Sequence, residues 1–182
     1  MAFRLSYNRC EEIKKIVVDT FVRLNIRCVP ISGFEIATKL NVTIIPYSYF
    51  TEEIKRLMLL KSEDGFCGKK NGEWFVWYND SKNYGRVNNT LMHEIGHIVL
   101  DHSQESDLAE AEANFFAKYA LAPPVLIHKL NLKNEYEVYE MFDISLEASK
   151  YAYSYYLKWL AYGEKDYTDY ELKLLQLFKP AV

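Results

Sequence analysis

The residues with the clearest chemical potential lie in one short segment of the chain. Of 4 histidines in all, three fall in the stretch MHEIGHIVLDH, which contains the pattern His93-Glu94-x-x-His97. On a helix, residues four positions apart project from one face, so both imidazoles can reach a single Zn²⁺. Glu94 lies about 100° further round the helix, near enough to take a proton from a water molecule beside the metal. The spacing predicts a zinc peptidase site with Glu94 as the general base.

The surroundings of this motif predict a buried helix. Five apolar residues flank it: Leu91, Ile95, Ile98, Val99 and Leu100. A chance match on a polar helix face is the alternative, but two buried histidines and a buried glutamate need partners, and a metal ion supplies them. Gly96, between the two histidines, would allow another backbone to approach closely.

A catalytic zinc usually takes a third protein ligand and leaves its fourth position to water. The residues considered for this third place are Asp101, His102, Glu105, Asp107, Glu110 and Glu112. Glu110 and Glu112 point about 200° apart on a helix, so only one of them can face the metal. We expect Glu110, with Asn114 one turn on supporting a ligand, and we expect Glu112 to be a solvated charge. Two alternatives stay open: a capping box between Asp107 and Glu110, and Glu112 as the ligand.

Two further residues follow the motif closely. His102 lies about 500° beyond His97, away from the metal-facing stripe, and is expected to be an exposed cation at the end of the helix. Asp101 follows His97 by four residues and either orients that imidazole or is simply solvated.

The elements that must position these residues are mainly helical. Apolar residues at helical spacing predict helices over residues 7–24, 34–40, 86–102, 107–121, 125–130, 135–141, 146–162 and 167–178, and Thr51 can cap another. Val42–Ile45 is predicted to be a strand, and Phe66–Lys70 with Trp74–Tyr78 a hairpin around Asn71-Gly72. The order indicates an α+β fold with a small sheet in its first half.

Composition excludes several classes of protein. The 182 residues suit one domain with a modest extension, and the formal net charge of -3 argues against direct nucleic-acid binding. The chain contains neither a stretch of roughly 18–20 apolar residues nor a signal-peptide core at its N-terminus. Cys10, Cys28 and Cys67 match neither a disulfide framework nor a Cys-x-x-Cys site, which favours a reducing cytoplasm.

A longer set of residues extends the zinc motif. It comprises Phe75-Val76-Trp77-Tyr78-Asn79, Arg86, His93-Glu94-Ile95-Gly96-His97, Glu110-Ala-Glu112-Ala-Asn114-Phe115-Phe116-Ala117 and Leu121-Ala122-Pro123. In this order they resemble the ImmA/IrrE family of zinc metallopeptidases, over about 50 residues. Asn89 stands where the family often has an aromatic residue, and Met92 where a small residue is usual. Neither departure touches an expected ligand.

The resemblance implies a zinc ion held by His93, His97 and Glu110, with Glu94 activating water. It also implies a zincin-like metallopeptidase core, which we assign to residues 1–125, with a small twisted sheet and two active-site helices. Residues 126–182 would form a helical extension packed on this core. The better-known members of the family cleave helix-turn-helix repressors of mobile elements or stress regulons, so the resemblance implies a protein substrate of that kind.

Two other functions are weighed against an active peptidase. One is a non-catalytic protein that sequesters a repressor through a zinc-stabilised scaffold, which the intact Glu94 disfavours because a structural site needs no base. The other is a DNA-binding regulator, which the acidic charge balance disfavours. Neither a membrane partner nor a particular oligomeric state is indicated.

The remaining features concern substrate binding. Nine of the 15 tyrosines lie between Tyr136 and Tyr170. The aromatic run of Tyr151, Tyr155, Trp159 and Tyr162 has helical spacing and is expected to pack the tail on the core, with substrate recognition as the alternative. An extended substrate could pair with an edge of the predicted hairpin. A side-chain donor for the oxyanion could come from Tyr84, Arg86 or His128. The sequence does not decide which edge of the hairpin is free or which of these side chains is the donor.

Overall fold

The computed structural model describes residues 4–163 and 166–179. Residues 1–3, 164–165 and 180–182 lie outside the described residues. The first range belongs to the predicted core, and the other two belong to the predicted C-terminal extension. The elements, in chain order, are α1 (Tyr7–Leu24), α2 (Gly33–Lys39), β1 (Thr43–Pro46), the 3-10 turn η1 (Tyr47–Tyr49), α3 (Glu52–Lys61), β2 (Gly65–Lys70), β3 (Glu73–Tyr78), α4 (Tyr84–Val99), α5 (Asp107–Leu121), α6 (Pro124–Lys129), α7 (Glu135–Phe142), α8 (Leu146–Tyr162) and α9 (Asp169–Leu177). This confirms the predicted α+β class with a helical C-terminal region.

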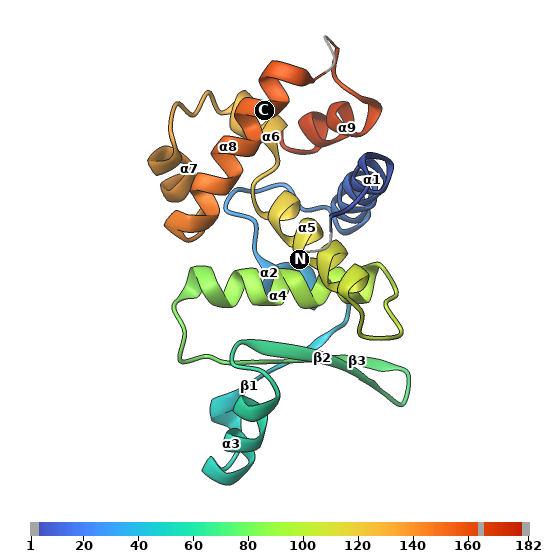
Figure 1. Cartoon of the computed structure of the whole chain (residues 1–182), viewed down its shortest axis with the longest axis vertical. Coiled ribbons are helices and arrows are strands. Elements are labelled where there is room, and N and C mark those ends of the chain that lie inside the picture. The colour runs from blue at the N-terminus through green and yellow to red at the C-terminus, as the bar shows by residue number, and fades with distance from the viewer. Residues whose placement is uncertain (1–3, 164–165, 180–182) are drawn as a thin grey trace.

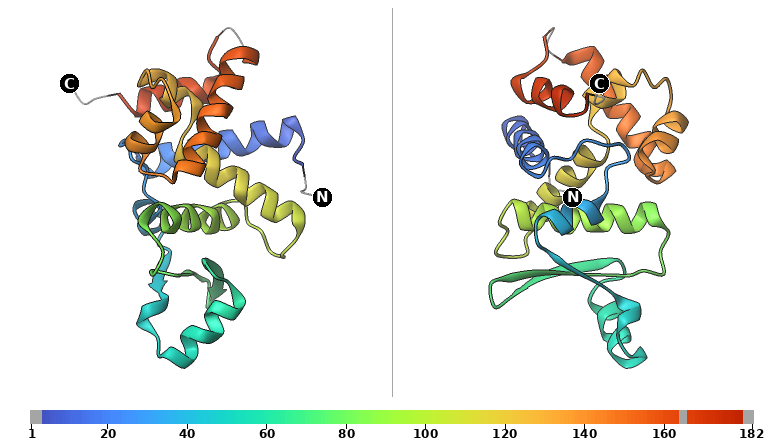
Figure 2. Two further views of the ribbon diagram at one scale, coloured as in Figure 1. Left: turned by 60° about the vertical axis from the view of Figure 1, so that its left-hand side comes forward. Right: turned by 180° about the vertical axis from the view of Figure 1, so that it is seen from behind.

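The molecule is layered, with α4 in the middle (Figure 1). The sheet lies on one side of α4, and α5 crosses its other side. Beyond α5, the N-terminal helix α1 gathers with α6, α8 and α9 at one end of the molecule, in all views (Figure 2). The helix α3 stands beyond the sheet, and none of its residues is buried. None of the helices in the described part of the chain is long and apolar enough to cross a membrane.

The sheet has the strand order β1-β3-β2. β1 runs parallel to β3, with Ile44 opposite Val76, and β2 runs antiparallel to it, with Cys67 opposite Val76. The predicted hairpin is confirmed: Asn71 and Gly72 have φ angles of 53° and 85°, the left-handed values that a tight two-residue hairpin turn requires. Because β3 is central, β2 presents the hairpin's unpaired edge among the described strands.

Side-chain caps set the start of the two helices that carry the predicted site. The carboxamide of Asn83 accepts from the Arg86 N–H at the start of α4, and the Ser106 hydroxyl accepts from the Ala109 N–H at the start of α5. Ser106 is therefore the N-cap of α5, and the capping box considered for Asp107 and Glu110 is wrong. At α3, Thr51 stands at the N-cap position, but its side chain makes no capping hydrogen bond.

The end of α4 differs from its predicted position at residue 102. The helix ends at Val99, because Asp101 adopts a left-handed φ of 54°. The Asp101 N–H donates to the Ile98 carbonyl at 3.2 Å, and the His102 N–H donates to the His97 carbonyl at 3.0 Å. These two bonds form a Schellman motif, which reverses the chain and turns His102 back toward the helix.

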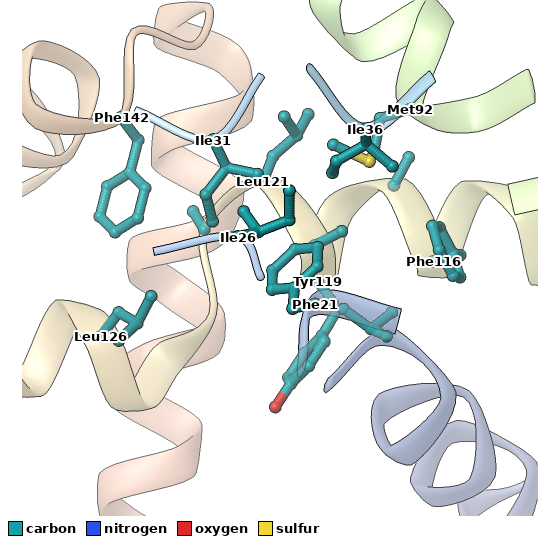
Figure 3. Close-up of a cluster of buried hydrophobic side chains, with 14 of the residues drawn as sticks. Phe21, Ile26, Ile31, Ile36, Met92, Phe116, Tyr119, Leu121, Leu126 and Phe142 are labelled. Atoms are coloured by element: carbon teal, nitrogen blue, oxygen red, sulfur yellow. The ribbon is translucent and has the colours of Figure 1, made fainter. Parts of the chain in front are cut away.

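One hydrophobic cluster joins the N-terminal and C-terminal parts of the chain. Figure 3 shows side chains from α1 and the following loop, including Phe21 and Ile31, beside Phe116 and Leu121 of α5. Leu126 and Phe142, which lie beyond residue 125, belong to the same cluster. Residues before and after position 125 therefore share one cluster, while the division into a core of residues 1–125 and a helical extension packed on it stays a prediction.

Candidate metal centre

The helices α4 and α5 approach each other closely at Gly96. A Cβ atom built on Gly96 would lie 3.2 Å from the Ala113 Cα and 3.3 Å from the Phe116 Cβ. The expectation that Gly96 admits another backbone is therefore confirmed. This close crossing brings the side chain of Glu110, on α5, to the two histidines of α4.

Three donor groups meet at this crossing. The Nε2 atoms of His93 and His97 lie 3.1 Å apart. The Glu110 carboxylate lies 3.4 Å from His93 Nε2 through one oxygen and 3.3 Å from His97 Nε2 through the other. Tetrahedral zinc with bonds of about 2.0–2.1 Å needs its ligand atoms roughly 3.3–3.4 Å apart. One ligand atom from each of the three residues lies within 4.8 Å of the others, so the group could hold a metal ion.

The electrostatics of His97 favour metal binding. Burial of the imidazole is the largest cause that lowers the pKa of His97 to about 4, and the neighbouring His93 is the next largest. The imidazole is therefore neutral at pH 7, with a lone pair free for a cation.

Glu94 lies in a different environment from the three donor groups. It is 7% exposed on the face of α4 that packs against β2. Burial raises its pKa, while His93 and hydrogen bonding from Cys67 act in the opposite direction. A raised pKa moves a carboxylate toward the value that suits a general base near neutral pH. Sequence reasoning did not identify Cys67 as a neighbour of Glu94. Cys67 lies on β2, which packs against α4, and its thiol therefore reaches the Glu94 carboxylate.

Two predictions about the residues beside the site are wrong. His102 is not an exposed cation, because the turn at Asp101 folds it back: its side chain is 11% exposed, and its Nδ1 lies 2.9 Å from Nδ1 of His97. Glu112 is not a solvated charge either. Its side chain is 6% exposed and lies 3.0 Å from His102 Nε2. Asp101 itself is exposed at the left-handed position of the turn.

Glu112 also binds a residue that sequence reasoning missed. Arg9, on α1, donates from Nε and Nη2 to the two Glu112 oxygens at 2.7 and 2.9 Å. These residues are 103 positions apart, so no local pattern could pair them. The two acids of α5 therefore have different neighbours: Glu110 faces the histidine pair of α4, and Glu112 faces Arg9 and His102.

The remaining candidates have other surroundings. Asn114 is exposed rather than placed against a ligand, and Glu105 and Asp107 are exposed as well. Among the proposed oxyanion donors, Arg86 is bonded to Asp64 at 2.6 and 2.9 Å. His128 lies 3.1 Å from the Tyr156 hydroxyl, and Tyr84 stacks on Phe34.

A cavity of about 1020 Å³ borders Glu110. The residues of the aromatic run all line it: Tyr151, Tyr155, Trp159 and Tyr162. Tyr155 and Trp159 also pack against the hydrophobic core, as predicted, whereas Tyr151 and Tyr162 are 43% and 87% exposed. The run therefore combines core packing with a surface that adjoins the site.

The contact at Gly96 leads to a testable prediction. Gly96→Val is expected to destabilise the protein by about 1–3 kcal/mol and to weaken metal binding, because the added methyl groups push α5 and its Glu110 away from α4. Gly96→Ala should have a smaller effect. Isothermal titration with zinc and thermal unfolding measure both quantities; zinc affinity in Gly96→Val equal to wild type would contradict the packing described.

The Arg9–Glu112 pair predicts how stability depends on pH. The hydrogen bonds from Arg9 hold the pKa of the Glu112 carboxyl below its ordinary range. The stability that the pair contributes is therefore present above the unfolded-state pKa of about 4.3 and is lost as the pH falls through the lower folded-state value. Glu112→Gln should lower the free energy of unfolding of the metal-free protein by about 2 kcal/mol at pH 7. Urea denaturation should show that this difference in the free energy of unfolding shrinks below about pH 4. An equal difference at pH 7 and below about pH 4 would refute the stabilising role given to the Arg9–Glu112 pair.

Comparison with known proteins yields one family. The model of Peptidase_M78, described as the IrrE N-terminal-like domain, matches residues 39–154. The matched segment contains His93, Glu94, His97 and Glu110 but not Arg9. No curated protein and no solved structure matches the chain.

Proposed function

The chain belongs to the Peptidase_M78 family, a metallopeptidase-like domain, and on this basis we propose that it is a zinc-dependent endopeptidase acting on a protein. The observation that carries the proposal is that the donor groups of His93, His97 and Glu110 lie 3.1–3.4 Å from one another. The buried Glu94 directly follows His93 in the sequence. The substrate that we propose is a helix-turn-helix repressor of a mobile element or stress regulon. We place the reaction in the cytoplasm, where such a repressor acts and where the free thiols Cys10, Cys28 and Cys67 stay reduced.

His93, His97 and Glu110 would hold the zinc ion. When bound, zinc supplies a Lewis acid that polarises the scissile carbonyl and acidifies a water molecule. The Glu94 carboxylate takes the proton of the attacking water and passes it to the leaving amine. Its burial between α4 and β2 limits competition from bulk water, and its raised pKa suits both the uptake and the release of that proton.

The strand β2 offers a place for an extended substrate. It is one of the two outer strands of the described sheet, and unlike β3 it has a free edge; it also packs against α4, the helix that carries Glu94. We propose that a substrate segment pairs its backbone with this edge, which would bring its peptide bonds past the metal centre. The central strand β3 is excluded from this role because both of its edges are paired.

The alternative is a protein that binds and sequesters a repressor without cutting it. The buried Glu94 argues against this function, because burying a carboxylate that ligates nothing costs stability without benefit to a purely structural site. The two functions differ in whether the partner's peptide bonds survive.

The test is to incubate the zinc-loaded protein with the helix-turn-helix protein encoded by a neighbouring gene and to map the products by mass spectrometry. We expect two fragments from one cleaved bond, formed by wild type and not by Glu94→Gln. An intact partner that co-elutes with the wild-type protein would support sequestration instead. An intact partner that does not co-elute would exclude it as the substrate.

A further inference from the structure

A chain of polar side chains leads from α1 to the metal-facing imidazole of His97. Arg9 donates two hydrogen bonds to Glu112, at 2.7 and 2.9 Å. Glu112 lies 3.0 Å from His102 Nε2, and His102 Nδ1 lies 2.9 Å from His97 Nδ1. The opposite nitrogen of His97, Nε2, faces His93 and Glu110. The residues therefore form a continuous path that ends at a proposed metal ligand.

The chemistry of the groups gives this path a direction. A guanidinium has only donors, and an ionised carboxylate has only acceptors. Glu112 therefore accepts from both Arg9 and His102, and the proton on His102 lies at Nε2. A neutral imidazole that donates through Nε2 accepts through Nδ1, so His97 donates its Nδ1–H to His102. This leaves the lone pair of His97 at Nε2, where a metal would bind.

The path is held rigidly and mostly away from water. The side chains of His97, His102 and Glu112 are 13%, 11% and 6% exposed. The Schellman turn fixes His102, and the two-fold contact with Arg9 fixes the Glu112 carboxylate. On α5, Glu112 and Glu110 point to different partners, so one helix contributes both a proposed ligand and the acceptor of this path.

We propose that His102, Glu112 and Arg9 are positioning residues, which set the tautomer and the orientation of the His97 ring for metal binding. The helix α1 thereby contributes to the metal centre although it lies outside the matched segment 39–154. The proposal rests on the proposed metal site, but not on peptidase activity. Partners of this kind typically change metal affinity by 10–100-fold when they are removed.

A simpler role for the same residues is to link α1 to α5 by an ion pair. The two roles predict different results for the protons of His97. If the residues only link helices, their replacement changes stability and leaves the tautomer of His97 as it was. If they position the ligand, the tautomer changes even where the fold is intact.

The test combines two measurements on His102→Leu, Glu112→Gln and Arg9→Gln. In the metal-free proteins, ¹⁵N NMR of the histidine side chains reads the tautomer directly. We expect His97 to be protonated at Nδ1 in wild type and to lose this preference in His102→Leu. Zinc affinity, measured by chelator competition, should fall about 10–100-fold in His102→Leu and Glu112→Gln, and by less in Arg9→Gln.

The matched control is Glu12→Gln. Glu12 also binds Arg9, at 2.9 Å, but its side chain is 59% exposed and does not touch Glu112 in the described contacts. This variant should keep both the tautomer and the zinc affinity of wild type. The proposal is overturned if folded His102→Leu keeps His97 protonated at Nδ1 and binds zinc within twofold of wild type. If His102→Leu does not fold, Glu112→Gln, which removes the carboxylate acceptor of His102 while keeping the shape of the side chain, provides the same test with the same limits. The wild-type protein could show the expected tautomer and zinc affinity and still cut no protein. That result would refute the proposed peptidase function and leave the positioning role of these residues intact.

Discussion

Glu94→Gln is expected to lower kcat/KM for substrate cleavage by about 10²–10⁴-fold, the usual contribution of a general acid–base group. Gln has nearly the same shape as Glu but cannot take a proton from water. The three ligand side chains are unchanged, so the zinc content of the variant should equal that of wild type. Cleavage is measured by following fragment formation, and zinc by elemental analysis of the same samples.

A matched control for Glu94→Gln is Glu105→Gln, which removes an equal charge at an exposed position close in sequence. Its activity should be that of wild type. Cleavage by Glu94→Gln at the wild-type rate would show that another group acts as the base. Loss of zinc from Glu94→Gln would instead indicate that Glu94 is a ligand.

The second large effect is expected from Glu110→Gln. A neutral amide oxygen is a weaker ligand for zinc than a carboxylate. Apparent zinc binding of about 10–16 kcal/mol at four-ligand structural sites, divided equally among the four ligands, gives roughly 2.5–4 kcal/mol for each ligand. The variant should therefore bind zinc about 10²–10³-fold more weakly, at about 1.4 kcal/mol per factor of ten.

The comparison that matters is with Glu112→Gln, two residues away. Its carboxylate faces Arg9 and His102, so we expect a smaller loss of zinc affinity than in Glu110→Gln. Chelator competition under identical conditions ranks the two variants. If Glu112→Gln bound zinc more weakly than Glu110→Gln, the assignment of the third ligand would be wrong.

The main parts of the site could be predicted from local geometry. Helical periodicity places His93 and His97 on one face of α4, and the angle of about 200° between Glu110 and Glu112 requires that they face different partners. The Asn-Gly turn was sufficient to predict the hairpin, because few residue pairs accept its left-handed angles. These features depend on residues that are close in sequence.

The parts that could not be predicted depend on one turn and on distant contacts. A single left-handed residue, Asp101, ends α4 early, and this turn carries His102 from the expected exposed position to His97. Glu112 is buried with Arg9 of α1 as its partner. The two residues are 103 positions apart, so this contact forms only when α1 packs beside α5 in the folded chain. The free edge of the hairpin likewise follows from the pairing of β1 with β3, which no short-range pattern specifies.

The most direct test of the central claim is a zinc titration of the metal-free protein, with substrate cleavage as the readout. We predict that cleavage of a single bond rises with added zinc and reaches a plateau at about one equivalent per chain, the stoichiometry of a site with one set of three protein ligands. In Glu94→Gln, zinc should bind to the same extent without restoring cleavage. Cleavage at the same rate without zinc, or a wild-type chain that binds no zinc at any pH tested, would contradict the account.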